Sequence, residues 1–238
     1  MKNDIAILTP MANEEEYAKN FILELLTYRK FFRKFKIFII IDKVSKDNTY
    51  KIVKDLEKKN SLLKVVWAPQ NKSVVDAYTQ GYKNCLKTNY KWILEIDSGG
   101  SHRPKDIKKF LKYMNNDHEC IFGSRFCLNG QMLNSNFTRY FFSKFGSLLT
   151  KLFFYMKISD TTSGYQMFQK KIIDKIIKKG LLSRDRFFQT EIKIYTRNKK
   201  IKEVPIHYIC KTHSVSFFSI VESIYLLFLI RCSKNNYL

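Results

Sequence analysis

The sequence predicts an α/β protein with a mostly parallel central sheet and helices on both faces of that sheet. Short apolar segments alternate with segments of helical periodicity along the first half of the chain, which is the pattern of such folds. Two of the apolar segments end in an aspartate, so their ends are expected to share one edge of the sheet. With 238 residues, 45% of them hydrophobic, the chain can bury one large core.

The elements of the first half follow from the positions of their apolar residues. Strands are expected at residues 5–8, 36–41, 63–67, 92–97 and 120–122, and helices at 13–29, 47–59, 71–86 and 107–114. Asn13 and Glu16 have the spacing of a capping box, so the first helix is expected to begin there.

Residues 92–104 are the most informative stretch. An apolar strand ends abruptly at Asp97 and is followed by a Gly-Gly turn and a proline that can open a helix. A carboxylate there lies at the C-terminal edge of the sheet, where open α/β folds usually bind ligands, and is a candidate for contacting a metal-bound diphosphate. The alternative is that Asp97 only ends the strand and caps the next turn. Asp42 ends the strand 36–41 in the same way.

The net charge of +22 implies an anionic partner, which is a nucleic acid, an acidic membrane surface or a phosphorylated small molecule. The lysines are spread along the chain, without an arginine-rich arm or a readout helix, so no nucleic-acid partner is expected. Part of the charge also fits a simple lysine-rich composition. A membrane surface and phosphate groups are the favoured partners.

Cysteines and histidines point to no metal or disulfide framework. The five cysteines form no CxxC pair, which favours a reduced, cytosolic compartment, and the four histidines lack zinc-ligand spacing. The first residues do not have the flanks of a signal peptide, and no stretch reaches the ~20 apolar residues of a spanning helix.

The second half contains two apolar stretches of a different kind. Residues 137–158 are crowded with aromatic side chains and carry four basic residues but no acidic one before Asp160. This pattern is typical of a helix that lies on an anionic membrane, and the alternative is a core helix with snorkelling lysines. The apolar stretch 217–230 is expected to lie on the membrane or to dock on that helix. We therefore expect a catalytic domain over residues 1–212 and a membrane-associating or docking segment over 213–238.

A series of short motifs runs along nearly the whole chain. The residues that carry them are Pro10, Asn13 and Glu14; Asp42, Ser45, Asp47 and Thr49; Asn71, Ala77 and Gly81; Asp97, Ser101, His102 and Pro104; Gly123, Ser124 and Arg125; Asp160, Thr162, Ser163 and Gly164; Phe188, Gln189 and Glu191; Glu203 to Ile206; and the basic loop from Lys211 to Ser216. In this order the chain resembles the inverting, nucleotide-sugar-dependent glycosyltransferases of family two with the GT-A fold. Among them it is most similar to the polyprenyl (dolichyl) phosphate sugar synthases.

The resemblance implies a sugar transfer from a nucleotide diphosphate sugar to a membrane polyprenyl phosphate, with a metal ion assisting departure of the nucleoside diphosphate. The implied catalytic residues are Asp97, Arg125 and Glu191, and the implied nucleotide-sugar-binding residues are Pro10, Asn13, Glu14, Asp42, Asn71 and Asp97. Arg125, Arg139, Lys211 and Ser216 are the implied ligands of the acceptor phosphate. Mg²⁺ or Mn²⁺ would be held by Asp97.

The nature of the acceptor decides whether a general base is needed. A lipid phosphate is already anionic near neutral pH, whereas a sugar hydroxyl must lose a proton. Glu191 and Asp160 are the only carboxylates on the matched motifs that could accept it. The aromatic basic segment favours the lipid acceptor, with the protein cytoplasmic and peripheral on the inner face of a membrane.

The chain also departs from the family pattern. Gly99 stands where the family has its second metal-binding aspartate, and Lys43 replaces an aspartate of the nucleotide strand. Metal binding is then expected to be weaker, unless Glu95 on the same strand face, water or the diphosphate completes the coordination shell. The alternatives are a glycosyltransferase acting on a saccharide hydroxyl in surface polysaccharide synthesis and a catalytically dead relative that only binds nucleotide sugar.

Overall fold

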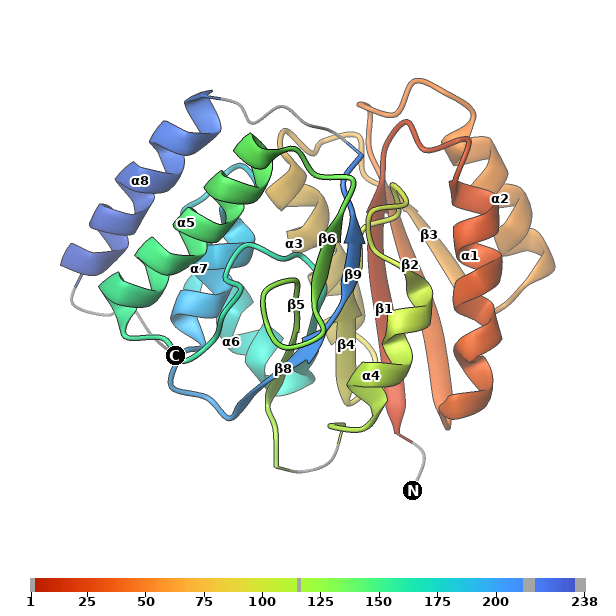
Figure 1. The fold of residues 1–238 in the computed structure, drawn as a ribbon. Helices are drawn as coiled ribbons and strands as arrows, with labels where there is room; N and C mark the ends of the chain where they lie inside the picture. The colour runs from red at the N-terminus through yellow and green to blue at the C-terminus, as the bar shows by residue number, and fades with distance from the viewer. Residues whose placement is uncertain (1–2, 115–116, 212–216, 234–238) are drawn as a thin grey trace.

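The computed structural model describes residues 3–114, 117–211 and 217–233, and within these ranges the chain is organised around a seven-stranded sheet (Figure 1). In spatial order the strands are β3 (Leu63–Trp67), β2 (Lys34–Ile41), β1 (Asp4–Met11), β4 (Trp92–Glu95), β7 (Gln166–Gln169), β5 (Cys120–Ser124) and β8 (Ile201–Pro205). β7 runs antiparallel to both of its neighbours, and the other pairs are parallel. The predicted mostly parallel sheet is therefore confirmed.

The parallel strands bring their C-terminal ends to one edge of the sheet. Met11 at the end of β1 pairs with Ile41 at the end of β2, and Leu8 pairs with Glu95 at the end of β4. Asp42 follows β2 directly and Asp97 comes two residues after β4, so both carboxylates lie past this edge, as the sequence predicts. A small second sheet pairs β6 (Gln131–Leu133) with β9 (His207–Ile209).

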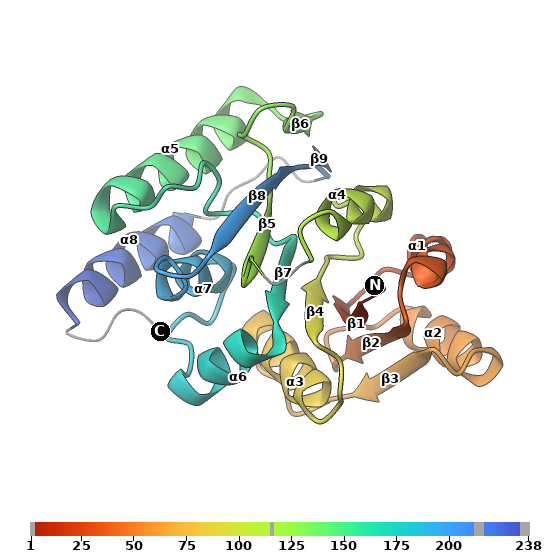
Figure 2. The same ribbon diagram turned by 90° about the horizontal axis from the view of Figure 1, so that it is seen from below.

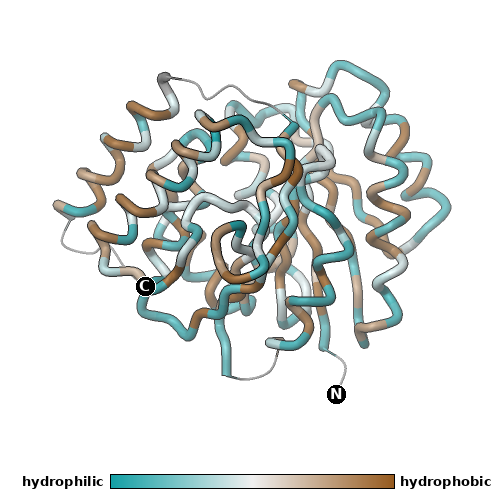
Figure 3. Tube along the Cα trace, in the orientation of Figure 1, coloured by the Kyte–Doolittle hydropathy of each residue, from teal (hydrophilic) through white to brown (hydrophobic). Residues whose placement is uncertain are grey.

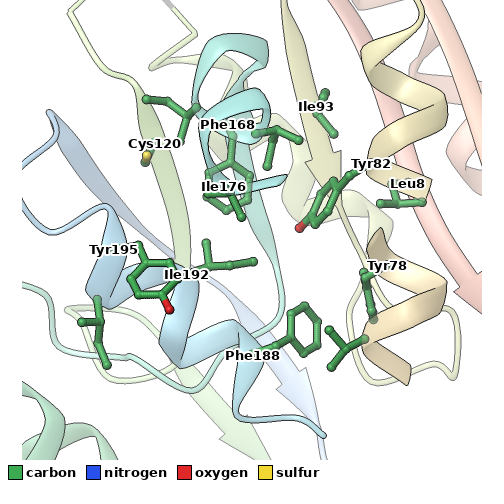
Figure 4. Packing of buried hydrophobic residues seen from close by; sticks show 14 of the residues in the cluster. Leu8, Tyr78, Tyr82, Ile93, Cys120, Phe168, Ile176, Phe188, Ile192 and Tyr195 are labelled. Carbon is green, nitrogen blue, oxygen red and sulfur yellow. The ribbon is translucent and has the colours of Figure 1, made fainter. Parts of the chain in front are cut away.

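Helices cover both faces of the sheet (Figure 2). The core on one face includes residues of α1 (Ala18–Thr27), α2 (Thr49–Lys59) and α4 (Ile107–Leu111), and the core on the other includes residues of α3 (Val74–Leu86), α6 (Lys170–Lys179) and α7 (Phe188–Tyr195). Successive residues of β1 alternate between the two cores, because side chains of a strand point to opposite faces. On the α3 side, Leu8, Tyr78 and Phe188 gather in one cluster (Figure 4).

Local chemistry sets the helix boundaries, and two helices, α1 and α3, begin later than predicted. α2 and β3 begin and end close to the predicted residues, whereas α1 begins at Ala18 without a side-chain cap, after residues of the expected capping box. Asn13 has a left-handed φ of 57° and binds the 44–46 loop instead. α3 begins three residues later than expected, because Ser73 and Asp76 form its capping box. Two 3₁₀ turns, Tyr28–Phe31 and Pro104–Asp106, follow α1 and precede α4.

α5 (Phe137–Phe154) and α8 (Phe217–Cys232) lie side by side at one flank of the molecule in both ribbon views. The side chain of Asn136 caps α5 by accepting a hydrogen bond from the Arg139 N–H at 2.9 Å. Phe153 and Phe228 join the two helices, with ring centroids 5.2 Å apart. α8 also buries Leu226, Leu227 and Ile230 in the core on the α3 side. The division of the chain at 212/213 stays a prediction.

α5 and α8 expose apolar side chains that a water-facing helix would bury. α5 buries Ser147 and Thr150 yet exposes a row of large residues: Phe137, Tyr140, Phe141, Phe142, Phe145, Leu148 and Leu152. α8 exposes Val221, Ile224, Tyr225, Phe228 and Leu229, and Figure 3 shows it as apolar along most of its length. We call these exposed residues of the two helices the apolar flank. None of the helices in the described ranges is both long and apolar enough to cross a bilayer.

Candidate active site

A hollow of about 620 Å³ opens at the C-terminal edge of the sheet. Segments after β1, β2, β4 and β5 line it, together with parts of α3, α5 and α7 and the chain around β9. Seven of the predicted site residues lie on its wall: Pro10, Glu14, Asp42, Asp97, Arg125, Arg139 and Lys211. The two aspartates at the strand ends therefore share one cavity, as the sequence predicts.

Asp97 is held by two neighbours and remains open to the hollow. Its Oδ1 accepts a hydrogen bond from the Tyr78 hydroxyl, its Oδ2 lies 3.2 Å from His102 Nδ1, and 39% of its side chain is exposed. Burial favours the protonated form, but His102 and Tyr78 outweigh it and hold the pKa of Asp97 below its ordinary value. Asp97 is therefore an ionised, oriented carboxylate at neutral pH.

Glu14 has a different environment on the same wall. Its backbone N–H donates to Thr49 Oγ1 at 2.7 Å, and within the described residues no group donates a hydrogen bond to its carboxylate. Burial raises the pKa of Glu14 to about 7, the charges of Asp97 and Asp47 add to the rise, and Lys211 opposes it. Glu14 is therefore a carboxylate that lacks a fixed partner and faces other negative charge.

The segment 42–49 forms a braced loop beside Glu14. Asp42 Oδ1 accepts a hydrogen bond from the Val44 N–H at 3.0 Å, and Asp47 accepts from the N–H groups of Glu15 and Thr49 at 2.9 and 3.0 Å. The amide of Asn13 joins this loop by accepting from the Lys46 N–H at 2.8 Å. Asn13 does not line the hollow, so the structure gives it a bracing contact where the sequence predicts nucleotide binding.

Arg125 is buried in a two-point ion pair. Its Nε and one terminal nitrogen each lie 2.8 Å from an oxygen of Asp160, and its backbone N–H donates to the same carboxylate. Burial opposes ionisation of Asp160, but the charge and hydrogen bonds of Arg125 outweigh it and lower the pKa of Asp160 to about 2. Asp160 is thus a permanent counter-ion and has no proton-accepting capacity near neutral pH. The charge of Arg125 is already paired, although its side chain lies on the wall of the hollow.

Besides Asn13, two predicted residues lie away from the hollow. Glu191 is buried and accepts hydrogen bonds from the N–H groups of Leu182 and Ser183 and from the Tyr195 hydroxyl, at 2.7, 2.9 and 2.6 Å. Asn71 is buried outside the wall, and Glu191 and Asn71 are both absent from the lining. These contacts assign Glu191 a structural place, so the geometry does not support the prediction that it is catalytic. Ser216 lies outside the described residues.

Glu95 cannot complete a metal shell as the sequence suggests. β4 ends at Glu95, so the strand alternation that would place it on the same face as Asp97 does not continue to position 97. Glu95 is fully buried, bonded to the Tyr82 hydroxyl and the amides of Gln166 and Gln189, and absent from the lining. Burial raises the pKa of Glu95 to about 8.

Several residues on the wall were not among the predicted site residues, notably Lys72, Tyr78, Arg186, Gln189 and Tyr208. Tyr78 has the spacing of a core residue on α3, and nothing in that spacing indicates that its hydroxyl reaches Asp97. Gln189 had one available signal, because it belongs to the motif that opens α7. A Cβ at Gly164 would lie 2.0 Å from Gln189 Nε2, so a larger residue there would require the Gln189 side chain to move.

The wall has an acidic part and a basic part. The acidic residues Glu14, Asp42 and Asp97 follow β1, β2 and β4, whereas Arg125, Arg139 and Lys211 come from the half of the fold that contains β5, α5 and β9. No group of three or more His, Cys, Asp or Glu side chains in the described ranges has the arrangement of a metal site. Carboxylate oxygen is nevertheless the donor that Mg²⁺ and Mn²⁺ prefer, and Asp97 offers it on the wall of the hollow.

A mostly parallel sheet with carboxylates in a hollow at its C-terminal edge has the arrangement predicted for a GT-A protein. The chain belongs to glycosyl transferase family 2, whose sequence profile matches residues 6–177, and it is a glycosyltransferase. The resemblance drawn from the motifs is thereby confirmed.

Similar proteins agree with this membership. The chain is 29% identical to the UDP-N-acetylglucosamine–dolichyl-phosphate N-acetylglucosaminyltransferase of Methanococcus voltae, over 89% of this chain and 88% of that one. It is 25% identical to the undecaprenyl-phosphate mannosyltransferase of Micrococcus luteus, over 72% and 71% of the two chains. Glucosyl-3-phosphoglycerate synthase from Mycobacterium tuberculosis, solved with Mn²⁺, uridine diphosphate and phosphoglyceric acid, shares the fold with a TM-score of 0.67 at 13% identity, over 97% of this chain and 79% of that one.

Proposed function

We propose that this glycosyltransferase transfers a sugar, with inversion at the anomeric carbon, from a nucleotide diphosphate sugar to a polyprenyl phosphate at a membrane surface. Both curated relatives named above carry a polyprenyl or dolichyl phosphate in their names. An oxygen of the lipid phosphate would attack the anomeric carbon, and the bond from that carbon to the diphosphate would break with its electron pair leaving on the nucleoside diphosphate.

The donor would occupy the acidic part of the hollow. Asp42, which shares this wall with Pro10, would hydrogen-bond the base, and Asp97 would hold Mg²⁺ or Mn²⁺. When bound, the ion supplies Lewis-acid stabilisation of the charge that develops on the leaving diphosphate. Tyr78 and His102 support this role because they keep Asp97 ionised and oriented toward the hollow.

The observation that carries the lipid acceptor is the position of Arg139. It lines the hollow from the first turn of α5, and the same helix then exposes the aromatic row of the apolar flank. A phosphate on Arg139 would therefore have its hydrocarbon chain next to exposed apolar side chains. Lys211 and Arg125 also lie on this wall. Neither Asp160 nor Glu191 is placed to act as a base, and an anionic phosphate needs none.

The test is an assay of transfer into lipid. The purified chain is incubated with vesicles containing a polyprenyl phosphate, Mn²⁺ and a panel of labelled UDP- and GDP-sugars. We expect label from at least one donor in the organic phase, released as free sugar by mild acid as a phosphodiester-linked sugar is. Label confined to a water-soluble saccharide would instead identify a hydroxyl acceptor. Donor binding without transfer to either acceptor would identify a catalytically dead relative.

The apolar flank is proposed to lie on the membrane, and this makes a separate prediction. Phe141 and Phe145 stack with their rings 5.7 Å apart and are 47% and 49% exposed. Replacing both with Gln should remove about 1 kcal/mol of burial each, which weakens binding to anionic vesicles by roughly 30-fold. Vesicle co-sedimentation across a lipid titration measures the change.

A matched control is available on the opposite edge of the sheet. Tyr50 and Trp67 also form an exposed aromatic pair, with ring centroids 5.1 Å apart. The double replacement of Tyr50 and Trp67 by Gln should leave vesicle binding unchanged. Equal losses in the two double variants would show that the apolar flank is not the membrane-binding surface.

A further inference from the structure

The space beside Gly99 contains a carboxylate from another segment of the chain. Gly99 occupies the position at which the family motif has an aspartate, and the adjacent space is not empty. A Cβ built at Gly99 would lie 2.9 Å from Glu14 Oε1 and 3.4 Å from Glu14 Oε2. The Glu14 carboxylate therefore stands where a side chain from position 99 would begin, and an aspartate there would require Glu14 to move.

The backbone around Glu14 keeps its carboxylate in this place. Its N–H donates to Thr49 Oγ1 at 2.7 Å, and its carbonyl accepts from the N–H groups of Tyr17 and Ala18 at 3.0 and 2.8 Å. Glu14 follows β1 and Asp97 follows β4, which are adjacent parallel strands, so the two carboxylates reach the hollow from neighbouring segments. The placement thus depends on the fold and not on a side-chain hydrogen bond.

Within the described residues, neither Glu14 nor Asp97 forms an ion pair with a lysine or an arginine. The nearby Lys211 ammonium lies over the Tyr17 ring, 4.4 Å from its centroid. His102 is 3% exposed; its Nδ1 lies 3.2 Å from Asp97 Oδ2, whereas its Nε2 has no hydrogen-bond partner among the described residues. Two adjacent carboxylates and a buried imidazole with one unpartnered nitrogen form a polar wall that a divalent cation fits.

We propose that Glu14 is the second carboxylate ligand of the divalent ion, acting with Asp97 in place of the aspartate that Gly99 lacks. This assignment deepens the proposed function, because the ion held there is the one that would meet the donor diphosphate. It differs from the nucleotide-binding role that the motif resemblance implies for Glu14.

The experiment measures metal binding directly and needs no acceptor. Mn²⁺ is titrated into the purified full-length chain in the presence of saturating UDP, and free Mn²⁺ is followed by its electron paramagnetic resonance signal. The variants are Glu14→Ala, Glu14→Ala with Gly99→Asp, and Glu16→Ala. Glu16 is an exposed acid two residues away and serves as the matched control.

We expect Glu14→Ala to weaken Mn²⁺ binding by at least ~10-fold, whereas Glu16→Ala should leave it unchanged. Adding Gly99→Asp should restore most of the affinity, since removal of the Glu14 side chain opens the space that an aspartate at 99 needs. The water-proton relaxation rate per bound Mn²⁺ should rise in Glu14→Ala, because water takes the place of a lost ligand. A purely structural role for Glu14 would not produce that rise.

Wild-type Mn²⁺ affinity in Glu14→Ala would overturn the proposal, and so would a double variant no better than the single one. These outcomes are independent of the acceptor. A protein that binds Mn²⁺ as expected but transfers no sugar to lipid would refute the proposed function while leaving the assignment of Glu14 intact.

Discussion

Replacing Asp97 with Asn is expected to lower sugar transfer by at least ~10²–10³-fold, the loss typical of removing a group that stabilises transition-state charge. The substitution removes the ionised carboxylate from the wall of the hollow and preserves the size of the side chain. Its amide oxygen can still accept the hydrogen bond from Tyr78, so the fold and the position of α3 should be retained. Transfer from the labelled donor that works best with the wild type measures the loss, and the melting temperature reports on folding.

The same loss should follow from removal of the divalent ion from the wild-type protein with a chelator, and added Mn²⁺ should reverse it. Asp55→Asn is the matched control, because Asp55 is an exposed carboxylate on α2 that pairs with Lys58 on the surface. If the Asp97→Asn protein retains more than a tenth of the wild-type transfer activity, Asp97 does not have the proposed catalytic role. Transfer that persists in the presence of the chelator would instead show that the reaction does not require a divalent ion.

The arrangement of Asp42 and Asp97 shows what sequence patterns determine in this chain. Each follows a short apolar strand, and because the strands are parallel, both carboxylates had to reach the same edge. The alternation of apolar strands with amphipathic helices fixed the position of nearly every element of the first half. The predictions that were wrong concern residues whose local sequence pattern competes with a contact to a distant segment. Asn13 has the spacing of a helix cap, but its amide is more favourably bonded to the loop after β2.

The sequence predicts which types of residue make up the candidate site, but it does not predict which groups each side chain contacts. Carboxylates of matched motifs are equivalent in the sequence, yet Asp97 faces the hollow while Asp160 is neutralised by Arg125 and Glu191 is enclosed by backbone N–H groups. Which carboxylate is available depends on contacts between segments that are distant in the chain. The Asp160–Arg125 pair joins residues 35 positions apart, and Glu14 approaches Gly99 from the loop after the neighbouring strand, although the two are far apart in the chain. No periodicity or spacing encodes such a pairing.

The Asp160–Arg125 pair makes the largest prediction for stability. Asp160→Asn should lower the free energy of unfolding at pH 7 by ~3–5 kcal/mol, because it leaves the buried Arg125 guanidinium without its counter-ion. Urea denaturation measures this loss. Asp174→Asn is the control, since Asp174 pairs with Lys178 on the surface and should cost less than about 1 kcal/mol.

The pH dependence of the loss follows from the pKa of Asp160. The folded-state pKa of about 2 lies below the ordinary value of 3.8, so the carboxylate stabilises the fold fully above pH ~4 and loses this contribution as the pH falls through 2. The gap in unfolding free energy between the wild type and Asp160→Asn should therefore be smaller at pH 3 than at pH 7. Replacing both partners, Asp160→Leu with Arg125→Met, should recover part of the stability, because it removes the buried charge as well as its partner. A gap that does not change with pH, or a double variant less stable than Asp160→Asn, would show that packing and not charge pairing makes Asp160 necessary.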